Sequence, residues 1–209
     1  MARAWMPEAE RLGADTTPAP AGIGAPRAVW TVTGSDPRAW SAREEARRML
    51  DGGRTSHLVW NPLTGEVVQT LAATRRGRLE LGGTRLNGLR LDHGHEGRVC
   101  LVVAVVASPE EPFTDGPMFG LEPILAWLDS WGIARVWPAG RPGTGSRTTE
   151  GGARLWARGG HFGHDQVPGS SCSKGPGRLD TTRLLGRTPL TDETLLHSTP
   201  PRPRPSAIG

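Results

Sequence analysis

The sequence contains no tyrosine, and it is poor in lysine and cysteine. Lys174 is the single lysine, so arginine carries almost all of the positive charge. The formal net charge is only +4, with 21 acidic residues set among 25 basic ones, although the pI is near 10.3. Proteins that bind nucleic acid concentrate basic residues on one face, whereas here the two signs are interspersed. We therefore expect no nucleic-acid partner.

Long apolar runs are also missing from the sequence. No stretch approaches the roughly 18 apolar residues that suggest a membrane-spanning helix. The first residues show no apolar segment of the signal-peptide kind. We expect no membrane span and no Sec-type signal, which predicts a protein that is cytoplasmic or released by lysis or by a non-Sec route.

The two cysteines lie in different surroundings. Cys100 is part of an apolar run, whereas Cys172 follows serines and a glycine. This contrast predicts a buried core thiol and an exposed loop thiol. A disulfide between the two is the alternative, so the redox state of the pair stays open.

The distribution of glycine and proline divides the chain into three parts. The 29 glycines and 19 prolines are concentrated at both ends and between residues 138 and 178. We expect an extended N-terminal arm at residues 1–26, a single domain at 27–180 and a Pro/Arg-rich tail at 181–209. The tail ends in Pro-Pro-Arg-Pro-Arg-Pro at residues 200–205, and its polar composition predicts disorder.

Apolar runs alternate with helical patterns, which predicts an α/β domain with a mixed central β-sheet flanked by helices. Residues 99–107 are apolar throughout, as in a strand covered on both faces, so we expect them to form the central strand. Residues 74–97 show no clear period, which suggests loops. The other strands are expected at residues 27–33, 57–60, 66–71 and 133–137. Helices are expected between Ser41 and Gly52, at 120–131 and at 153–157.

The densest set of potential metal ligands lies in the glycine-rich residues 159–168, Gly-Gly-His-Phe-Gly-His-Asp-Gln-Val-Pro. His161 and His164 are three positions apart, and Cys172 follows eight positions after the second histidine. Imidazole and thiolate are the ligands that zinc prefers. The alternative is a loop in which His161 hydrogen-bonds the backbone and Cys172 is unreactive.

This stretch resembles the C-terminal signature of the zinc-dependent N-acetylmuramoyl-L-alanine amidases, a superfamily that includes the peptidoglycan recognition proteins. The first nine residues look like the start of amidase-like proteins of actinobacteria and their phages. The segments 57–69, 113–118 and 125–132 are similar to the second and third strands of the family and to its helix before the ligand loop. The resemblance implies an amidase-like fold, an endolysin-like role in the cell wall, and peptidoglycan or muropeptide as the partner.

The resemblance also implies a zinc site with a catalytic acid, and most of its positions are changed here. The positions of the first ligand, the catalytic carboxylate and the third ligand hold Thr31, Ala104 and Gly175. Only His164 matches a ligand position with its chemistry intact, and zinc is therefore doubtful as a cofactor. Lys174 would be the donor to the oxyanion, while His161 and Cys172 are substitute ligands.

Other conspicuous residues allow weaker predictions. We expect Trp30, His57 and His161 to line a ligand-binding cleft, and Trp127 and Trp131 to lie in the core. For the acid and histidine cluster at residues 92–96, we expect a hydrated loop rather than a second metal site.

Three hypotheses for the function follow. The first is a peptidoglycan-binding, amidase-like domain that is catalytically impaired. The second is an active zinc-dependent amidase whose site is relocated to His164, Cys172 and another histidine. The third is a decayed prophage product or an intracellular interaction protein without a cell-wall ligand.

Overall fold

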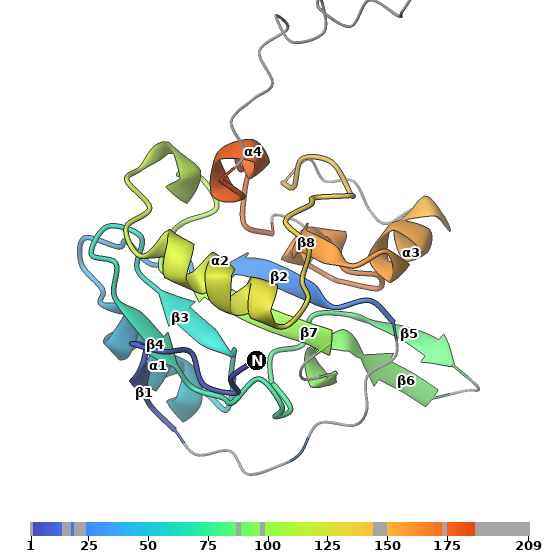
Figure 1. Ribbon diagram of the computed structural model, residues 1–209, viewed down its shortest axis with the longest axis horizontal. Helices are drawn as coiled ribbons and strands as arrows, with labels where there is room; N and C mark the ends of the chain where they lie inside the picture. The colour runs from blue at the N-terminus through green and yellow to red at the C-terminus, as the bar shows by residue number, and fades with distance from the viewer. Residues whose placement is uncertain are drawn as a thin grey trace, which may run out of the picture.

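A computed structural model describes residues 2–13, 18, 24–86, 89–96, 99–143, 150–172 and 175–186 (Figure 1). Within them the chain forms a mixed six-stranded sheet in the order β1-β4-β3-β7-β2-β8. The strands are β1 (Glu10–Arg11), β2 (Arg27–Val32), β3 (Leu58–Trp60), β4 (Val67–Gln69), β7 (Cys100–Val105) and β8 (Gly160–Gly163). The fold is thus the mixed α/β single domain that the sequence predicts.

The strand β7 lies inside the sheet, parallel to β2 on one side and to β3 on the other. All six of its residues are buried, which confirms the prediction of a central strand. The strands β3 and β4, at the places expected for strands at 57–60 and 66–71, pair antiparallel and form a hairpin with its turn at residues 61–65. The carboxyl ends of β2, β3 and β7 therefore meet at one edge of the sheet.

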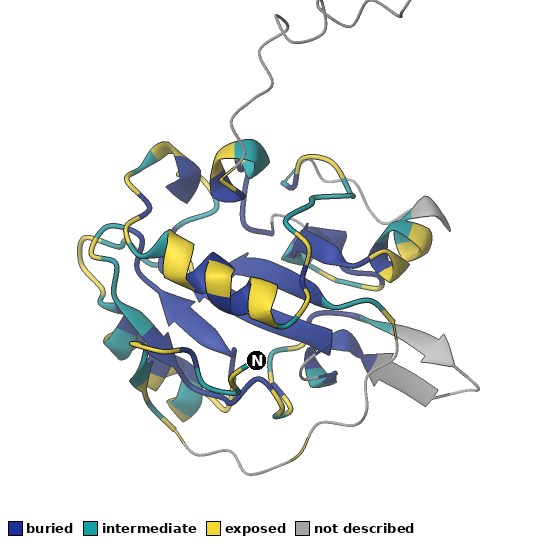
Figure 2. Cartoon of the chain, in the orientation of Figure 1, coloured by how far each residue is buried: buried dark blue, intermediate teal, exposed yellow. Residues whose placement is uncertain are grey.

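Two helices cover opposite faces of this sheet. Side chains alternate between the faces of a strand; Leu101, Val103 and Val105 pack with α2 (Leu121–Ser130), whereas Ala104 packs with α1 (Ala42–Asp51). The capping box of Ser41 and Glu44 begins α1 as predicted. Figure 2 shows the exposed side of α2 turned away from the buried strands.

A third helix and a small hairpin extend the face on which α1 lies. The helix α3 (Glu150–Ala157) contributes Trp156 to a cluster with Phe162 and Val102. The strands β5 (Gly83–Leu86) and β6 (Leu89–Asp92) form a separate antiparallel pair where we predicted loops. That prediction was wrong because closely spaced arginines obscure the strand pattern, although Asn-Gly between two short runs is a strong hairpin signal.

The last short strand predicted at residues 133–137 is also absent from the described structure. The segment follows α2 as a loop, and only the carbonyl of Val136 bonds to β8, accepting a hydrogen bond from the amide of His161 at 2.8 Å. One contact of this kind is too little to extend the sheet.

Both ends of the described chain pack on the domain. Met6 is buried, its amide donates to Gln69 Oε1 at 2.6 Å, and Trp127 Nε1 donates to the carbonyl of Arg3 at 2.9 Å. The helix α4 (Thr181–Leu184) places Leu184 and Leu185 in the core, so the domain extends past the boundary predicted at residue 180. None of the described helices is long and apolar enough to cross a membrane.

Candidate functional site

The stretch that we predicted as a ligand loop is in fact a buried edge strand followed by a single 3-10 turn. His161 lies on β8, which pairs in parallel with β2, and His164 begins the turn His164–Gln166. The two histidines consequently leave the strand in different directions. Their spacing in sequence does not make them neighbours in one site.

His161 and Trp30 form a contact inside the core. The indole Nε1 of Trp30 donates to His161 Nδ1 at 2.9 Å, and the two rings stack with centroids 6.0 Å apart. Burial, together with the positive charge of Arg135, lowers the pKa of His161 to about 3, so its imidazole is neutral. Both side chains are fully buried, and the prediction that they line a cleft was wrong.

His57 is likewise a structural residue. Its side chain is fully buried, and Nδ1 accepts a hydrogen bond from the amide of Val102 at 3.0 Å. Burial lowers the pKa of His57 to about 4. The residue ties the start of β3 to β7, and its complete burial corrects our prediction that it lines a cleft.

Thr31 and His164 are in contact with each other. Thr31 Oγ1 lies 3.3 Å from His164 Nδ1, at the carboxyl end of β2. Burial lowers the pKa of His164, while backbone hydrogen bonds at Glu80 and Leu81 oppose that shift. His164 and Thr31 therefore form a pair of a neutral imidazole and a neutral hydroxyl.

Ala104 has no room for a larger side chain. It faces α1, where it packs against Ala42, Ala46 and Val59, and it is almost completely buried. A carboxylate at this position would be buried among methyl groups without a partner, at a high cost in free energy. The structure is therefore adapted to alanine here.

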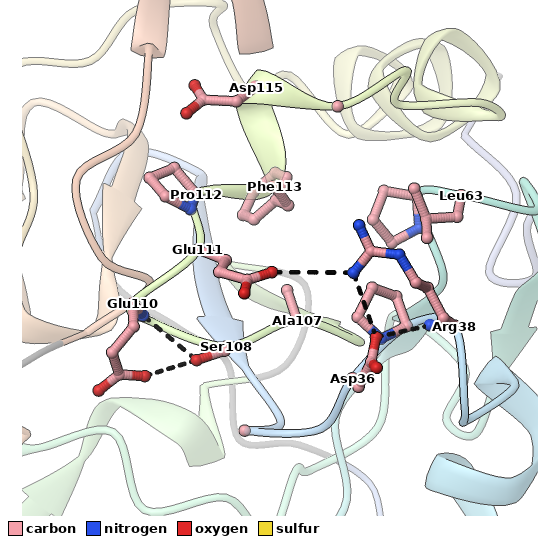
Figure 3. Close-up of a pocket in the computed structure, with 14 residues that line it drawn as sticks. Asp36, Arg38, Leu63, Ala107, Ser108, Glu110, Glu111, Pro112, Phe113 and Asp115 are labelled. Atoms are coloured by element: carbon pink, nitrogen blue, oxygen red, sulfur yellow. Dashed lines mark hydrogen bonds and ion pairs between the residues drawn. The ribbon is translucent and has the colours of Figure 1, made fainter.

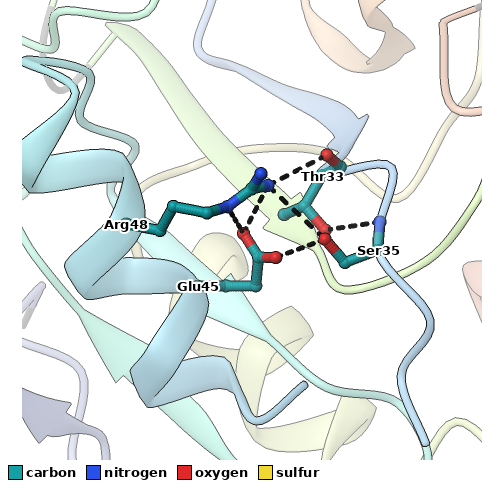
Figure 4. Close-up of polar contacts among 4 residues, drawn as sticks. All are labelled: Thr33, Ser35, Glu45 and Arg48. Carbon is teal, nitrogen blue, oxygen red and sulfur yellow. Dashed lines mark hydrogen bonds and ion pairs between the residues drawn. The ribbon is translucent and has the colours of Figure 1, made fainter. Parts of the chain in front are cut away.

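A buried acid nevertheless lies on α1, and the sequence analysis missed it. Glu45 is completely buried and accepts hydrogen bonds from Ser35 Oγ and from Arg48 Nε and Nη2, the latter two at 3.0 and 2.8 Å (Figure 4). Arg48 also reaches the carbonyl of Thr33 at 3.4 Å. With both oxygens engaged, Glu45 fastens α1 to the chain after β2. Only its position in the first turn of a capped helix was visible in the sequence.

Gly175, at the expected third ligand position, lies against a second acid that we did not predict as a site residue. A Cβ built on Gly175 would overlap the carboxylate of Asp165, and Gly175 has a φ of +54°. Asp165 Oδ2 accepts a hydrogen bond from the amide of Gly143 at 2.7 Å, whereas Oδ1 has no hydrogen-bond partner among the residues that the structure describes. Burial raises the pKa of Asp165. The Asp165 carboxyl thus fills the space that a side chain at 175 would need.

The remaining predicted ligands do not complete a metal site. Cys172 is partly exposed and Cys100 is buried, and both are free thiols, so the alternative of a disulfide was wrong. Burial, with the negative charge of Glu96, raises the pKa of the Cys100 thiol. Lys174 lies outside the described residues. Among the described residues, no group of three or more His, Cys, Asp or Glu side chains is placed to hold a metal ion, so the donor set does not fit zinc.

The acid and histidine cluster after β6 is buried rather than hydrated, contrary to our prediction. His93 Nδ1 lies 2.9 Å from Glu96 Oε1, and Arg27 Nη1 lies 3.8 Å from Glu96 Oε2. The Arg27 guanidinium also stacks 4.6 Å above the Trp156 ring. The Asp92 carboxylate accepts from the backbone amides of residues 81, 82 and 94. These contacts fasten the β5–β6 hairpin to the sheet.

The structure does contain a cleft, at the carboxyl ends of β2, β3 and β7 (Figure 3). Its volume is about 680 Å³, which is in the range of small-molecule and peptide sites. The loops that form it carry four acids, one arginine and an apolar group: Asp36, Glu110, Glu111, Asp115, Arg38, Pro37, Pro62, Leu63, Pro112 and Phe113. The sequence analysis missed the cleft because its residues come from three loops without a common motif.

Comparisons with known proteins give structural similarity only. No family model and no curated protein matches the sequence. The chain is similar in structure to the hydrolase AmiA of Staphylococcus aureus, solved in complex with its ligand, with 14% identity, a TM-score of 0.49, and coverage of 87% of this chain and 82% of that one. It is also similar to a selenomethionine derivative of AmpD, with 15% identity, a TM-score of 0.36, and coverage of 60% and 72%.

Proposed function

We propose that this protein is an amidase-like domain that binds peptidoglycan fragments and does not hydrolyse them. The proposal starts from the resemblance in sequence at residues 57–69, 113–118 and 159–177. The observation that carries it is the contact of Thr31 with His164, because a hydroxyl stands against the imidazole where the resemblance expects a second zinc ligand.

The chemistry of the three changed positions supports the loss of hydrolysis. Amide hydrolysis by a metal needs an open coordination position and a base for the attacking water. Thr31 provides a neutral hydroxyl, Ala104 provides no ionisable group, and Gly175 provides no donor atom. Ala104 and Gly175 are also packed against their neighbours, so that no space remains at these two positions for the missing group.

The cleft at the carboxyl edge supports a binding function. In sheets with parallel strands, ligands bind outside the carboxyl ends of the strands. Trp40 and Phe119 do not line the cleft, but they lie further along two of the loops that do. They are 39% and 57% exposed and are the exposed large hydrophobic residues of the described chain. Aromatic faces of this kind pack on sugar rings, which are present in every muropeptide.

A sedimentation assay with purified peptidoglycan sacculi tests binding. We expect the protein to sediment with the sacculi, and we expect Trp40→Ala with Phe119→Ala to weaken binding by at least about tenfold, since aromatic anchors dominate such sites. Trp5→Ala is the matched control, because this partly exposed tryptophan lies near β1 and stacks with Arg11. Absence of the wild-type protein from the pellet would contradict the proposal and favour an interaction partner outside the cell wall.

The second arm of the experiment tests hydrolysis. Sacculi are incubated with the protein and added zinc, and released peptides with an amino-terminal alanine are measured by mass spectrometry. We expect no release above that of heat-treated protein. Zinc-dependent release, together with stoichiometric zinc that is lost in Cys172→Ser, would instead establish an active amidase with a relocated site.

A further inference from the structure

The rim of the cleft carries negative charge on a protein whose net charge is positive. Among the described residues that line it, four carboxylates stand against one guanidinium, that of Arg38, whereas the whole chain has a formal net charge of +4. Arg38 Nη1 lies 3.7 Å from Asp36 and 3.9 Å from Glu111. The exposed carboxylate of Asp115 makes no hydrogen bond or ion pair with other described residues, and Figure 3 shows it apart from the Arg38 group. Such a surface suits a ligand with more than one positive charge.

The same cleft offers a surface for proline rings. Pro37, Pro62, Pro112 and Phe113 line it. Two backbone contacts hold exposed aromatic residues at the adjoining loops: Asn61 Nδ2 donates to the carbonyl of Trp40 at 2.9 Å, and the amide of Phe119 donates to Pro62 at 2.9 Å. Extended, Pro-rich peptides bind in grooves with aromatic walls, and carboxylates at the rim of such a groove pair with arginine.

The described chain ends beside this cleft. In α4, Arg183 Nη2 donates to the carbonyl of Gly116 at 2.7 Å, and the amide of Asp180 donates to Thr114 Oγ1 at 3.0 Å. Gly116 lines the cleft, and the described structure stops at Gly186. Pro200 lies fourteen positions after Gly186, which allows a span of up to about 45 Å in an extended chain. Residues 200–205 are therefore within reach of the cleft.

We propose that the cleft binds the segment Pro200-Pro-Arg-Pro-Arg-Pro205 of the same chain. The segment supplies what the cleft lacks: two guanidinium groups for the acidic rim and four proline rings for the apolar wall. Arginine also pairs with carboxylates through two parallel hydrogen bonds, which gives geometric selectivity over lysine. Covalent attachment raises the effective concentration of the segment to the order of 1 mM, so weak contacts suffice.

This inference does not depend on the proposed function, since the complementarity is between two parts of one chain. It predicts that any other ligand of the cleft must displace the segment. Removing the two guanidinium groups of the segment therefore strengthens the binding of any other ligand that occupies the cleft.

Paramagnetic NMR on the full-length protein tests the proposal. A nitroxide is attached to Ser206→Cys in a Cys172→Ser background, in which the buried Cys100 resists labelling. We expect selective broadening of the amide signals of Leu63 and Gly116 at the cleft, and none at Arg11 and Leu71. Uniform broadening or none overturns the proposal.

Charge reversal tests whether the two arginines hold the segment in the cleft. We expect Arg202→Glu with Arg204→Glu to reduce the bound fraction by about fivefold, as for two exposed ion pairs, whereas the control Arg187→Glu leaves it unchanged. Glu111→Arg with Asp115→Arg also removes the broadening, and combining the two pairs of reversals restores it. An unchanged signal in either pair of reversals overturns the proposal.

A mixing experiment distinguishes binding of the segment to its own chain from binding to a second copy. Nitroxide-labelled protein of natural isotopic abundance is mixed with unlabelled ¹⁵N protein. We expect no broadening of the cleft amides in this mixture. Broadening there would mean that the segment binds a neighbouring molecule, which contradicts the proposal.

Discussion

The packing of Gly175 against Asp165 allows a double-mutant cycle that tests how the third ligand position is filled. We consider Gly175→Ala, Asp165→Gly and the two together. The alanine meets two obstacles, because the backbone at 175 is left-handed, with φ at +54°, and because its Cβ would overlap the Asp165 carboxylate. Removing Asp165 relieves only the second obstacle.

The two obstacles have different expected magnitudes. A left-handed backbone costs a non-glycine residue about 1–2 kcal/mol, and forcing a methyl group into occupied space costs about 1–3 kcal/mol. Gly175→Ala should therefore destabilise the protein by about 2–5 kcal/mol. In the Asp165→Gly background the same change should cost only about 1–2 kcal/mol, which leaves a coupling of about 1–3 kcal/mol between the two sites.

Gly53 provides the matched control. It also has a positive φ, +70°, but a Cβ built on it meets no atom within 4 Å. Gly53→Ala thus reports the backbone cost alone. The free energy of unfolding of all variants is measured by urea titration with tryptophan fluorescence. A cost for Gly175→Ala no greater than that for Gly53→Ala, or additivity in the cycle within about 0.5 kcal/mol, would refute the reasoning.

Two further predictions concern stability. Glu45→Ala removes the hydrogen-bond partner of Ser35 and Arg48 and should lower the free energy of unfolding by about 3 kcal/mol. This is the low end for a buried ion pair, because Arg48 is half exposed. As a control, Glu44→Ala at an exposed position should cost only about 1 kcal/mol, since it removes a contact of the helix cap. The pKa of His57 is about 4 in the fold, below its ordinary value of 6.5, so the unfolded chain takes up the proton first as pH falls. His57 alone should accordingly contribute a loss of up to about 1.4 kcal/mol per pH unit from pH 6.5 to 4, to which the other histidines with lowered pKa values add, and His57→Gln should reduce the total slope by about this amount.

The sheet could be predicted from the sequence because its pattern is local and apolar. The run at 99–107, the capping box at Ser41 and the stripe of α2 each depend on neighbours in sequence. The β5–β6 hairpin was missed because arginines interrupt the alternation there. The turn at residues 164–166 and the edge strand β8 were missed because glycines suggested a loop, although parallel pairing with β2 satisfies their backbone.

The candidate site could be predicted only in part, because it depends on contacts between distant segments. The proximity of Thr31 and His164, 133 positions apart, followed from the resemblance and not from any local pattern. The burial of Trp30 and His161 could not be seen in the sequence, since a tryptophan on a strand can face either the core or a cleft. Asp165 was overlooked because its neighbour His164 carried the expected chemistry.

The small residues at two of the positions that the sequence resemblance assigned to a reactive site are closely packed against their neighbours. Ala104 lies against Ala46, and the backbone of Gly175 lies against the Asp165 carboxyl, so each small residue matches a group that occupies the space a larger one would need. Introducing a carboxylate at 104 or a donor at 175 by a single substitution would therefore produce overlap rather than a functional group with room to act. A donor at 175 would require a paired change at Asp165, and the double-mutant cycle proposed for these two residues would measure that barrier.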